Sequence, residues 1–133
     1  MIEEARTDVQ VNDNMALEAA REFAAAVAET DEYRAFDEAQ VQLGRDATAQ
    51  EAIRAYQEKR QALVWQLQLG AVADAEREDL QRLEQTMLAL PAVQAFVEAQ
   101  GRLGQLCREI DGVVSEAIGL SFAAGCGPGC ACG

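Results

Sequence analysis

Hydrophobic residues recur at spacings of three and four along most of the chain, which is the period of one helix face. The pattern predicts five helices. The first begins at Asn12 or Asp13, because a short side-chain oxygen there accepts a free backbone N–H. Residues 1–12 show no clean period, so we expect a loose arm. The stripe that should be buried on the first helix comprises Ala16, Leu17, Ala20, Phe23, Ala24 and Val27.

Polar caps and glycines mark the ends of the next two predicted helices. The cap is Thr30 or Asp31 for the second helix and Asp46 or Thr48 for the third, and the glycines are Gly44 and Gly70. Glycine adopts the left-handed conformation freely, so we expect the second helix to end near Leu43 and the third before Gly70. The predicted inner face of the third helix consists of Ile53, Tyr56, Arg60, Leu63, Val64 and Leu67.

The fourth and fifth helices are separated by Pro91, which suits the first turn of a helix. Asp74 is the expected cap of the fourth, whose inner residues are Leu80, Leu83, Met87 and Leu90. The fifth carries a heptad-like seam of Phe96, Gln100, Leu103, Cys107, Ile110, Val114, Ala117 and Ser121. Such a seam predicts tight packing on another helix along its length.

The length of the fifth helix bears on oligomeric state. About 30 residues form a rod of roughly 45 Å, whereas a compact chain of 133 residues has a radius of gyration of about 14 Å. The rod would therefore extend beyond its own domain, and we infer a homodimer that covers the excess. An elongated monomeric hairpin is the alternative.

Composition agrees with an all-α fold. Half the residues are hydrophobic, aromatic residues make up only 5%, and the strong helix formers Ala, Leu, Glu, Gln and Arg dominate. We expect one helical domain at residues 1–121, built as an elongated antiparallel hairpin or bundle with a long C-terminal helix. Residues 122–133 carry no charge and should form an irregular, flexible tail rich in cysteine and glycine.

Charge limits the partners that the chain can bind. The net charge is −12, and residues 1–43 hold 11 acidic and 3 basic residues. Such a surface repels phosphate backbones, so we expect no direct nucleic-acid binding. It suits a basic protein partner, or it serves solubility alone. The first residues lack the pattern of a signal peptide and no stretch reaches a membrane span, so we expect a cytoplasmic protein that does not contact membranes.

Residues suited to catalysis are scarce. The chain contains no histidine, the commonest general base, and we therefore expect no enzyme activity. Arg54, Lys59 and Arg60 form a small basic cluster. At helical spacing these side chains are more consistent with pairing to neighbouring acids than with binding phosphate.

The tail carries the most specific chemical signal. Cys126, Cys130 and Cys132 lie within seven residues, among glycines that let the backbone wrap closely around an ion or cluster. Thiolates suit zinc, copper(I) and iron–sulfur clusters. A site with four ligands would need one more, from Cys107, a second subunit or a partner.

Interpretations of the cysteines that involve no metal also stay open. The tail could be a disordered appendage with inert thiols, and its last four residues resemble a prenylation box only weakly, because the final residue is glycine. Cys107 lies on the predicted seam. There a cysteine is more often a small buried hydrophobe than a metal ligand.

Two runs of the chain resemble the bacterial YlbF/YmcA family. They are ETDEYRAFDEAQVQLGRDATAQEAIRAYQEK, similar to the first half of the family, and LPAVQAFVEAQGRLGQLCREIDGVVSEAIG, similar to its last helix. Together they cover about half of the chain, and the order of helices agrees. The cysteine-rich tail is similar to the C-terminal cysteines of some members.

The resemblance implies an all-helical, dimer-forming adaptor of the bacterial cytoplasm. Family members resemble regulators within a complex that carries iron–sulfur clusters, affects competence, sporulation and biofilm formation, and modulates RNA processing by ribonuclease Y. On this interpretation Cys126, Cys130 and Cys132 are the cluster ligands, with zinc as the alternative. Two other classes compete with the adaptor: a metal-handling or thiol-redox protein whose tail is the working part, and a purely structural helical module.

Overall fold

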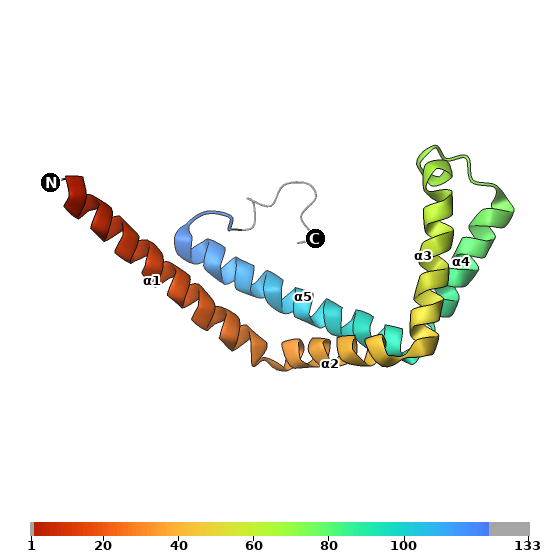
Figure 1. Ribbon diagram of the computed structural model, residues 1–133, viewed down its shortest axis with the longest axis horizontal. Coiled ribbons are helices and arrows are strands. Elements are labelled where there is room, and N and C mark those ends of the chain that lie inside the picture. Colours follow the sequence, from red (N-terminus) through yellow and green to blue (C-terminus); the bar gives the residue numbers. More distant parts are fainter. Residues whose placement is uncertain (1, 123–133) are drawn as a thin grey trace.

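The computed structural model describes residues 2–122, with side chains described from Asn12 onward. This part of the chain is all-α, as the sequence predicted, and contains five helices (Figure 1). Their bounds are α1 (Ile2–Ala28), α2 (Asp31–Arg45), α3 (Ala47–Gln68), α4 (Asp74–Leu88) and α5 (Pro91–Ile118).

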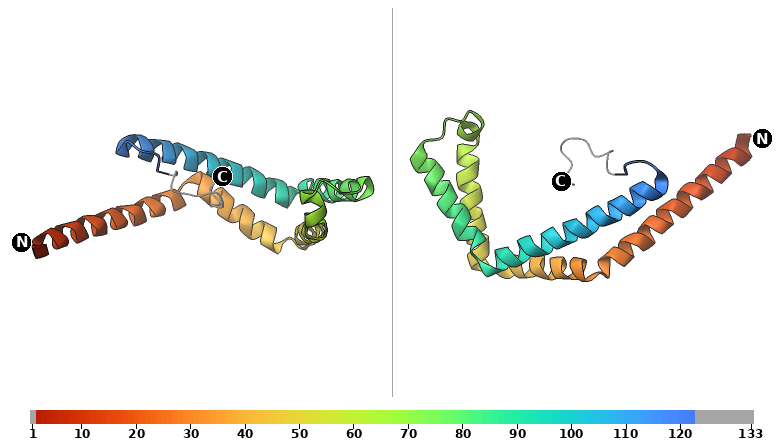
Figure 2. Two further views of the ribbon diagram at one scale, coloured as in Figure 1. Left: turned by 90° about the horizontal axis from the view of Figure 1, so that it is seen from above. Right: turned by 180° about the vertical axis from the view of Figure 1, so that it is seen from behind.

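The helices form two arms that meet at an angle (Figures 1 and 2). In one arm α5 runs back along α2, and this is the most extensive helix pair of the molecule. In the other arm α3 and α4 form an antiparallel hairpin. Helix α1 continues outward from α2 (Figure 1), and the view from above shows that it diverges from α5 (Figure 2, left). The elongated architecture that the sequence predicted is therefore confirmed.

The core is small because two-helix arms have little interior. The buried hydrophobic residues within the described part are Ala39, Ala49, Leu63, Val72, Val93 and Ala99. Half of them are alanines, which allow helix axes to approach closely. Between α2 and α5 the rings of Phe36 and Phe96 pack with centroids 5.5 Å apart, within the range for favourable aromatic pairs.

One residue forms the corner between the two arms. The backbone N–H of Asp46 donates to the carbonyls of Gln42 and Leu43 at the end of α2, and its carboxylate accepts from the N–H of Ala49 at 2.9 Å in α3. Asp46 thus closes one helix and caps the next, so the turn needs no further residues. Of the two caps that the sequence allowed for the third helix, Asp46 and Thr48, Asp46 is the one used.

A glycine fixes the turn at the far end of the α3–α4 hairpin. Gly70 has a φ of 66°, in the left-handed region. Its N–H donates to the Leu67 carbonyl, and the Ala71 N–H donates to that of Gln66. This pair of bonds is a Schellman motif, which satisfies the last carbonyls of α3. Gly70 therefore ends the third helix as predicted, and buried Val72 holds the following loop against the hairpin.

Three predicted helix ends were wrong. Helix α1 begins at Ile2, so residues 2–12 are helical and not a loose arm; no glycine or proline interrupts this run. Gly44 lies inside α2, because the bonds to Asp46 carry the helix to Arg45. Asp74 is the first residue of α4 and not its cap; the cap position belongs to Ala73. An acid in the first turn still favours the helix through its dipole.

Two predicted inner faces are exposed in this protomer. On α1, Leu17 is 55% exposed and Phe23 47% exposed, because α1 leaves the body of the molecule and little packs against it. On α3, Arg60 is exposed and Leu67 is 40% exposed, because α4 alone covers one side of that helix. Thr30 and Pro91 begin α2 and α5 as the sequence predicted.

The double role of Asp46 gives a stability prediction. Replacing Asp46 with Ala removes the side-chain bond to the Ala49 N–H, and we expect the free energy of unfolding to fall by about 1 kcal/mol. Asp46→Asn keeps an accepting oxygen and is the matched control, with little expected change. Urea unfolding followed by circular dichroism measures both. Equal loss in the two variants would show that charge, not capping, matters at this corner.

Candidate functional site

Cys126, Cys130 and Cys132 lie outside the described residues, so their convergence on one centre stays a prediction. Cys107 is described and its side chain is exposed on α5. The interpretation of Cys107 as a buried hydrophobe is therefore wrong for this protomer. Between residues 12 and 122, no group of three or more potential metal ligands is found.

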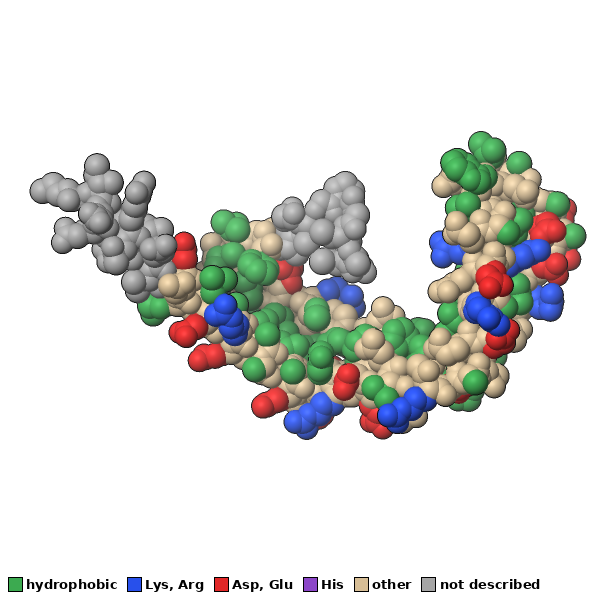
Figure 3. Space-filling model, in the orientation of Figure 1, with side chains coloured by type: hydrophobic (Ala, Val, Ile, Leu, Met, Phe, Trp, Pro, Cys, Tyr) green, Lys and Arg blue, Asp and Glu red, His purple; other side chains and the backbone are tan. Residues whose placement is uncertain are grey.

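The main feature of the described surface is the uncovered half of α5. This helix has 28 residues and α2 has 15, which correspond to about 42 Å and about 22 Å of length. Helix α2 therefore accompanies only the first half of α5. From Leu103 to the end of α5, the apolar side chains are half-buried or exposed: Leu103, Leu106, Ile110, Val113, Val114 and Ile118. Hydrophobic side chains form a nearly continuous band along this helix (Figure 3).

The apolar stripe of α1 is uncovered in the same way. Met15, Leu17 and Phe23 are all exposed, and only Val27, close to α2, is half-buried. The contacts of α1 with the rest of the molecule are few and lie mainly on α2. A helix alone in water is marginal, and most helical stability in proteins comes from packing of an apolar face. The apolar stripe of α1 is therefore left largely exposed by the rest of the chain.

We define the uncovered parts of α1 and α5 as the open face. It consists of Met15, Leu17 and Phe23 on α1 and of the α5 residues from Leu103 to Ile118 named above. Its chemistry is that of a helix-packing surface.

The basic cluster on α3 is engaged within the hairpin. Lys59 forms ion pairs with Glu76 and, at 3.9 Å, with Asp79 of α4. Arg54 donates to Glu51 one turn away, and this bond together with the charges of Glu51 and Glu58 raises the pKa of Arg54. The prediction that these bases pair with neighbouring acids is confirmed for Lys59 and Arg54. Lys59 in particular ties α3 to α4.

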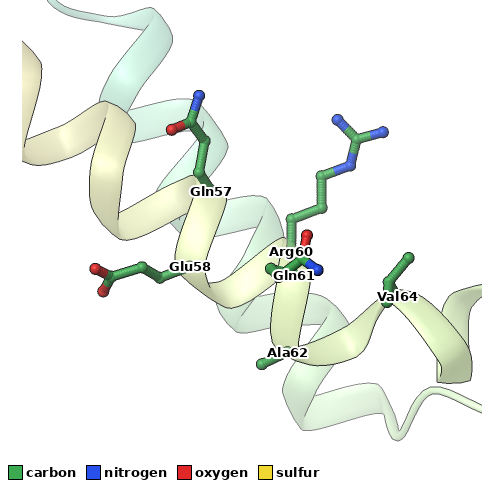
Figure 4. Close-up of a pocket in the computed structure, with 6 residues that line it drawn as sticks. All are labelled: Gln57, Glu58, Arg60, Gln61, Ala62 and Val64. Atoms are coloured by element: carbon green, nitrogen blue, oxygen red, sulfur yellow. The ribbon is translucent and has the colours of Figure 1, made fainter.

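Two recesses in the described surface do not resemble substrate sites. The larger one lies along α3, and Figure 4 shows its side chains, such as Gln57, Glu58 and Val64, fanning out around the helix. They do not converge on a common point. The second recess is a shallow groove between α2 and α5, floored by alanines that include Ala35 and Ala95. Close approach of two alanine-rich helices explains it.

One exposed feature was missed in the sequence. Trp65, the single tryptophan of the chain, is 75% exposed on α3. It follows the buried Leu63 by two positions, which is about 200° around a helix axis and therefore almost the opposite side. The signal was present in the sequence, because Trp65 falls outside the predicted inner face.

No described helix is both long enough and apolar enough to cross a bilayer.

Comparisons with known proteins place the chain in a family. A family model described as "Control of competence regulator ComK, YlbF/YmcA" matches residues 16–119. The chain is also 29% identical over 105 residues to UPF0342 protein DSY2926 of Desulfitobacterium hafniense (strain Y51), covering 76% of this chain and 82% of the relative. No solved structure matches significantly. Because the family model spans α2 to α5 and about half of α1, well over half of the chain, the chain belongs to the YlbF/YmcA family of competence regulators.

Proposed function

We propose that this protein is a non-enzymatic regulatory adaptor that acts by protein–protein interaction. The observation that carries the proposal is the open face on α1 and α5, which is apolar, extended and uncovered in the protomer. A monomeric soluble protein rarely leaves such a surface exposed. Membership of a regulator family supports the same role.

The chemistry of the side chains also favours a binding protein. The chain has no histidine, and the polar side chains around the larger recess diverge. A chain that binds through helices needs neither a general base nor a closed pocket. By family likeness, the regulated processes are competence, sporulation, biofilm formation and RNA processing with ribonuclease Y. The strongly acidic surface means that any RNA would be held by such a partner, and we place the protein in the cytoplasm.

The first occupant of the open face is a second copy of the chain. In a two-fold pair the same surface meets itself, so α1 and the second half of α5 from each copy would bury one another's apolar stripes. Half-buried Leu103 and Ile110 would become core residues of this four-helix layer. Exposed Cys107, between them on α5, would approach the partner.

Dimerisation gives a direct prediction. We expect light scattering to report a dimer at micromolar concentration for the native chain and a monomer for Ile110→Asp. The substitution would bury an unpaired charge, and the dissociation constant should rise at least about a hundredfold. Gln94→Glu adds the same charge at an exposed position of α5 and should stay dimeric. A native chain that scatters as a monomer would contradict the proposal.

The cysteines of the tail are the proposed metal or cluster ligands. Three thiols at Cys126, Cys130 and Cys132 fit a thiophilic ion such as zinc or an iron–sulfur cluster, by the chemistry of the donors. A metal-handling or thiol-redox protein, in which this tail is the working part, is the alternative function. An adaptor should keep its protein partners when the tail is deleted, whereas the alternative should lose its activity.

The tail therefore has its own test. We expect protein purified without air to contain iron with acid-labile sulfide, or zinc, and the variant with Ser at positions 126, 130 and 132 to contain neither. Cys107→Ser is the matched control, and retained metal there would show that Cys107 is not required as a ligand. Equal metal content in the native chain and the triple variant would exclude the tail as the site.

A further inference from the structure

The free end of the α3–α4 hairpin carries a second apolar surface, distant from the open face (Figure 1). Trp65 is 75% exposed and Leu69 is 80% exposed, the two highest values among the large hydrophobic residues of the described part. They are four residues apart and therefore neighbours on one helix face. Figure 3 shows hydrophobic side chains gathered at this end of the hairpin.

The exposure of these side chains does not come from a loose end. The Gly70 Schellman motif terminates α3 directly after Leu69, and Val72 is buried in the loop that follows. Leu63 is buried on α3 two residues before Trp65, and Lys59 is tied to α4 by ion pairs. The backbone that presents Trp65 and Leu69 is therefore held in place before any partner arrives, which lowers the entropy cost of binding.

The same face of α3 continues away from the turn. Ala62 precedes Trp65 by three residues, and Glu58 precedes Ala62 by four. Glu58, Ala62, Trp65 and Leu69 therefore form one stripe, which we call the tip stripe. Ala62 is small and exposed, and it leaves room for an incoming side chain beside the indole. Glu58 supplies a negative charge two turns from Trp65.

The size of the stripe selects the kind of partner. The exposed parts of Trp65 and Leu69 together amount to roughly 300 Å². A stable complex of two globular proteins buries about 800 Å² on each partner, so this surface is too small to hold a second copy of the chain by itself. It matches one face of a single short helix, which binds through apolar anchors at helical spacing.

Charge selects further among such helices. Glu58 lies on the stripe, and the hairpin residues 47–90 hold seven acidic and five basic residues, so basic residues beside the anchors of the partner would be attracted. The same charge repels anionic lipid surfaces. We propose that the tip stripe docks a short, basic, amphipathic helix of another protein. This inference rests on the proposed adaptor role and names the chemistry of one of its partners.

Because Trp65 is the single tryptophan, its fluorescence reports on the stripe alone. The probe is a tryptophan-free amphipathic peptide of leucine and lysine, titrated into the full chain, with a matched peptide carrying glutamate in place of lysine. We expect the lysine peptide to shift the Trp65 emission to shorter wavelength and to saturate, and the glutamate peptide to leave it unchanged. No shift with the lysine peptide, or equal shifts with both, would overturn the proposal.

Two uncharged substitutions test the contact itself. Leu69→Gln should weaken binding of the lysine peptide at least about tenfold, since it removes an apolar side chain that the bound peptide would bury. Glu58→Gln should weaken the same binding severalfold. Leu88→Gln, a matched change at an exposed leucine of the same hairpin, should have no effect. Equal weakening by Leu69→Gln and Leu88→Gln would contradict a site on the tip stripe.

Other occupants are outcomes of the same experiment. A shift with phosphatidylglycerol vesicles but not with the peptide would assign the stripe to a membrane. A shift on concentrating the protein alone would assign it to a second copy. Light scattering on the same samples measures whether the chain is dimeric, and therefore tests the open face on α1 and α5 separately. A failed titration with an intact dimer therefore overturns the tip stripe and leaves the proposed adaptor role in place.

Discussion

The structure depends on one mismatch of length. Helix α5 has 28 residues, and its packing partner α2 has 15. The excess of α5, together with α1, presents apolar side chains that the protomer leaves half-buried or exposed. Hydrophobic burial is the dominant favourable term in folding, and the described part of the chain has only six buried hydrophobic residues. The proposed association with another chain would bury part of this exposed apolar surface.

Each of the two arms carries one of the proposed binding surfaces. The α1–α2–α5 arm offers a long apolar face suited to self-association, whereas the α3–α4 hairpin is closed by its own contacts and exposes only a small stripe at its end. Asp46 separates the arms by ending α2 and capping α3 without an intervening loop. Because both caps use one residue, the corner is short and each arm can hold its own partner at a defined distance from the other.

Local chemistry made much of the fold predictable from the sequence. Thr30, Asp46 and Pro91 act at helix starts, and Gly70 acts at a helix end, through bonds or backbone angles that involve only near neighbours. Gly44 failed as a stop because Asp46, two residues later, caps the helix. Such a competition between adjacent signals is decided by geometry and not by residue type.

Burial was less predictable, since periodicity identifies an apolar face without naming what covers it. The stripe of α1 was found correctly, but Leu17 and Phe23 are exposed because the covering element is absent from the protomer. Trp65 was overlooked because it lies outside the apolar face that was predicted for α3. The cysteine tail shows the opposite case: its donors are evident from the sequence, whereas their geometry lies beyond the described residues.

Amide hydrogen exchange in α1 tests the central claim most directly, because this helix has almost no support within the protomer. The account predicts that amides of residues 12–28 exchange slowly at micromolar concentration and that exchange accelerates on dilution, as the covering chain dissociates. Exchange as fast as in a free peptide at every concentration would contradict it. Slow exchange that does not depend on concentration would contradict it as well.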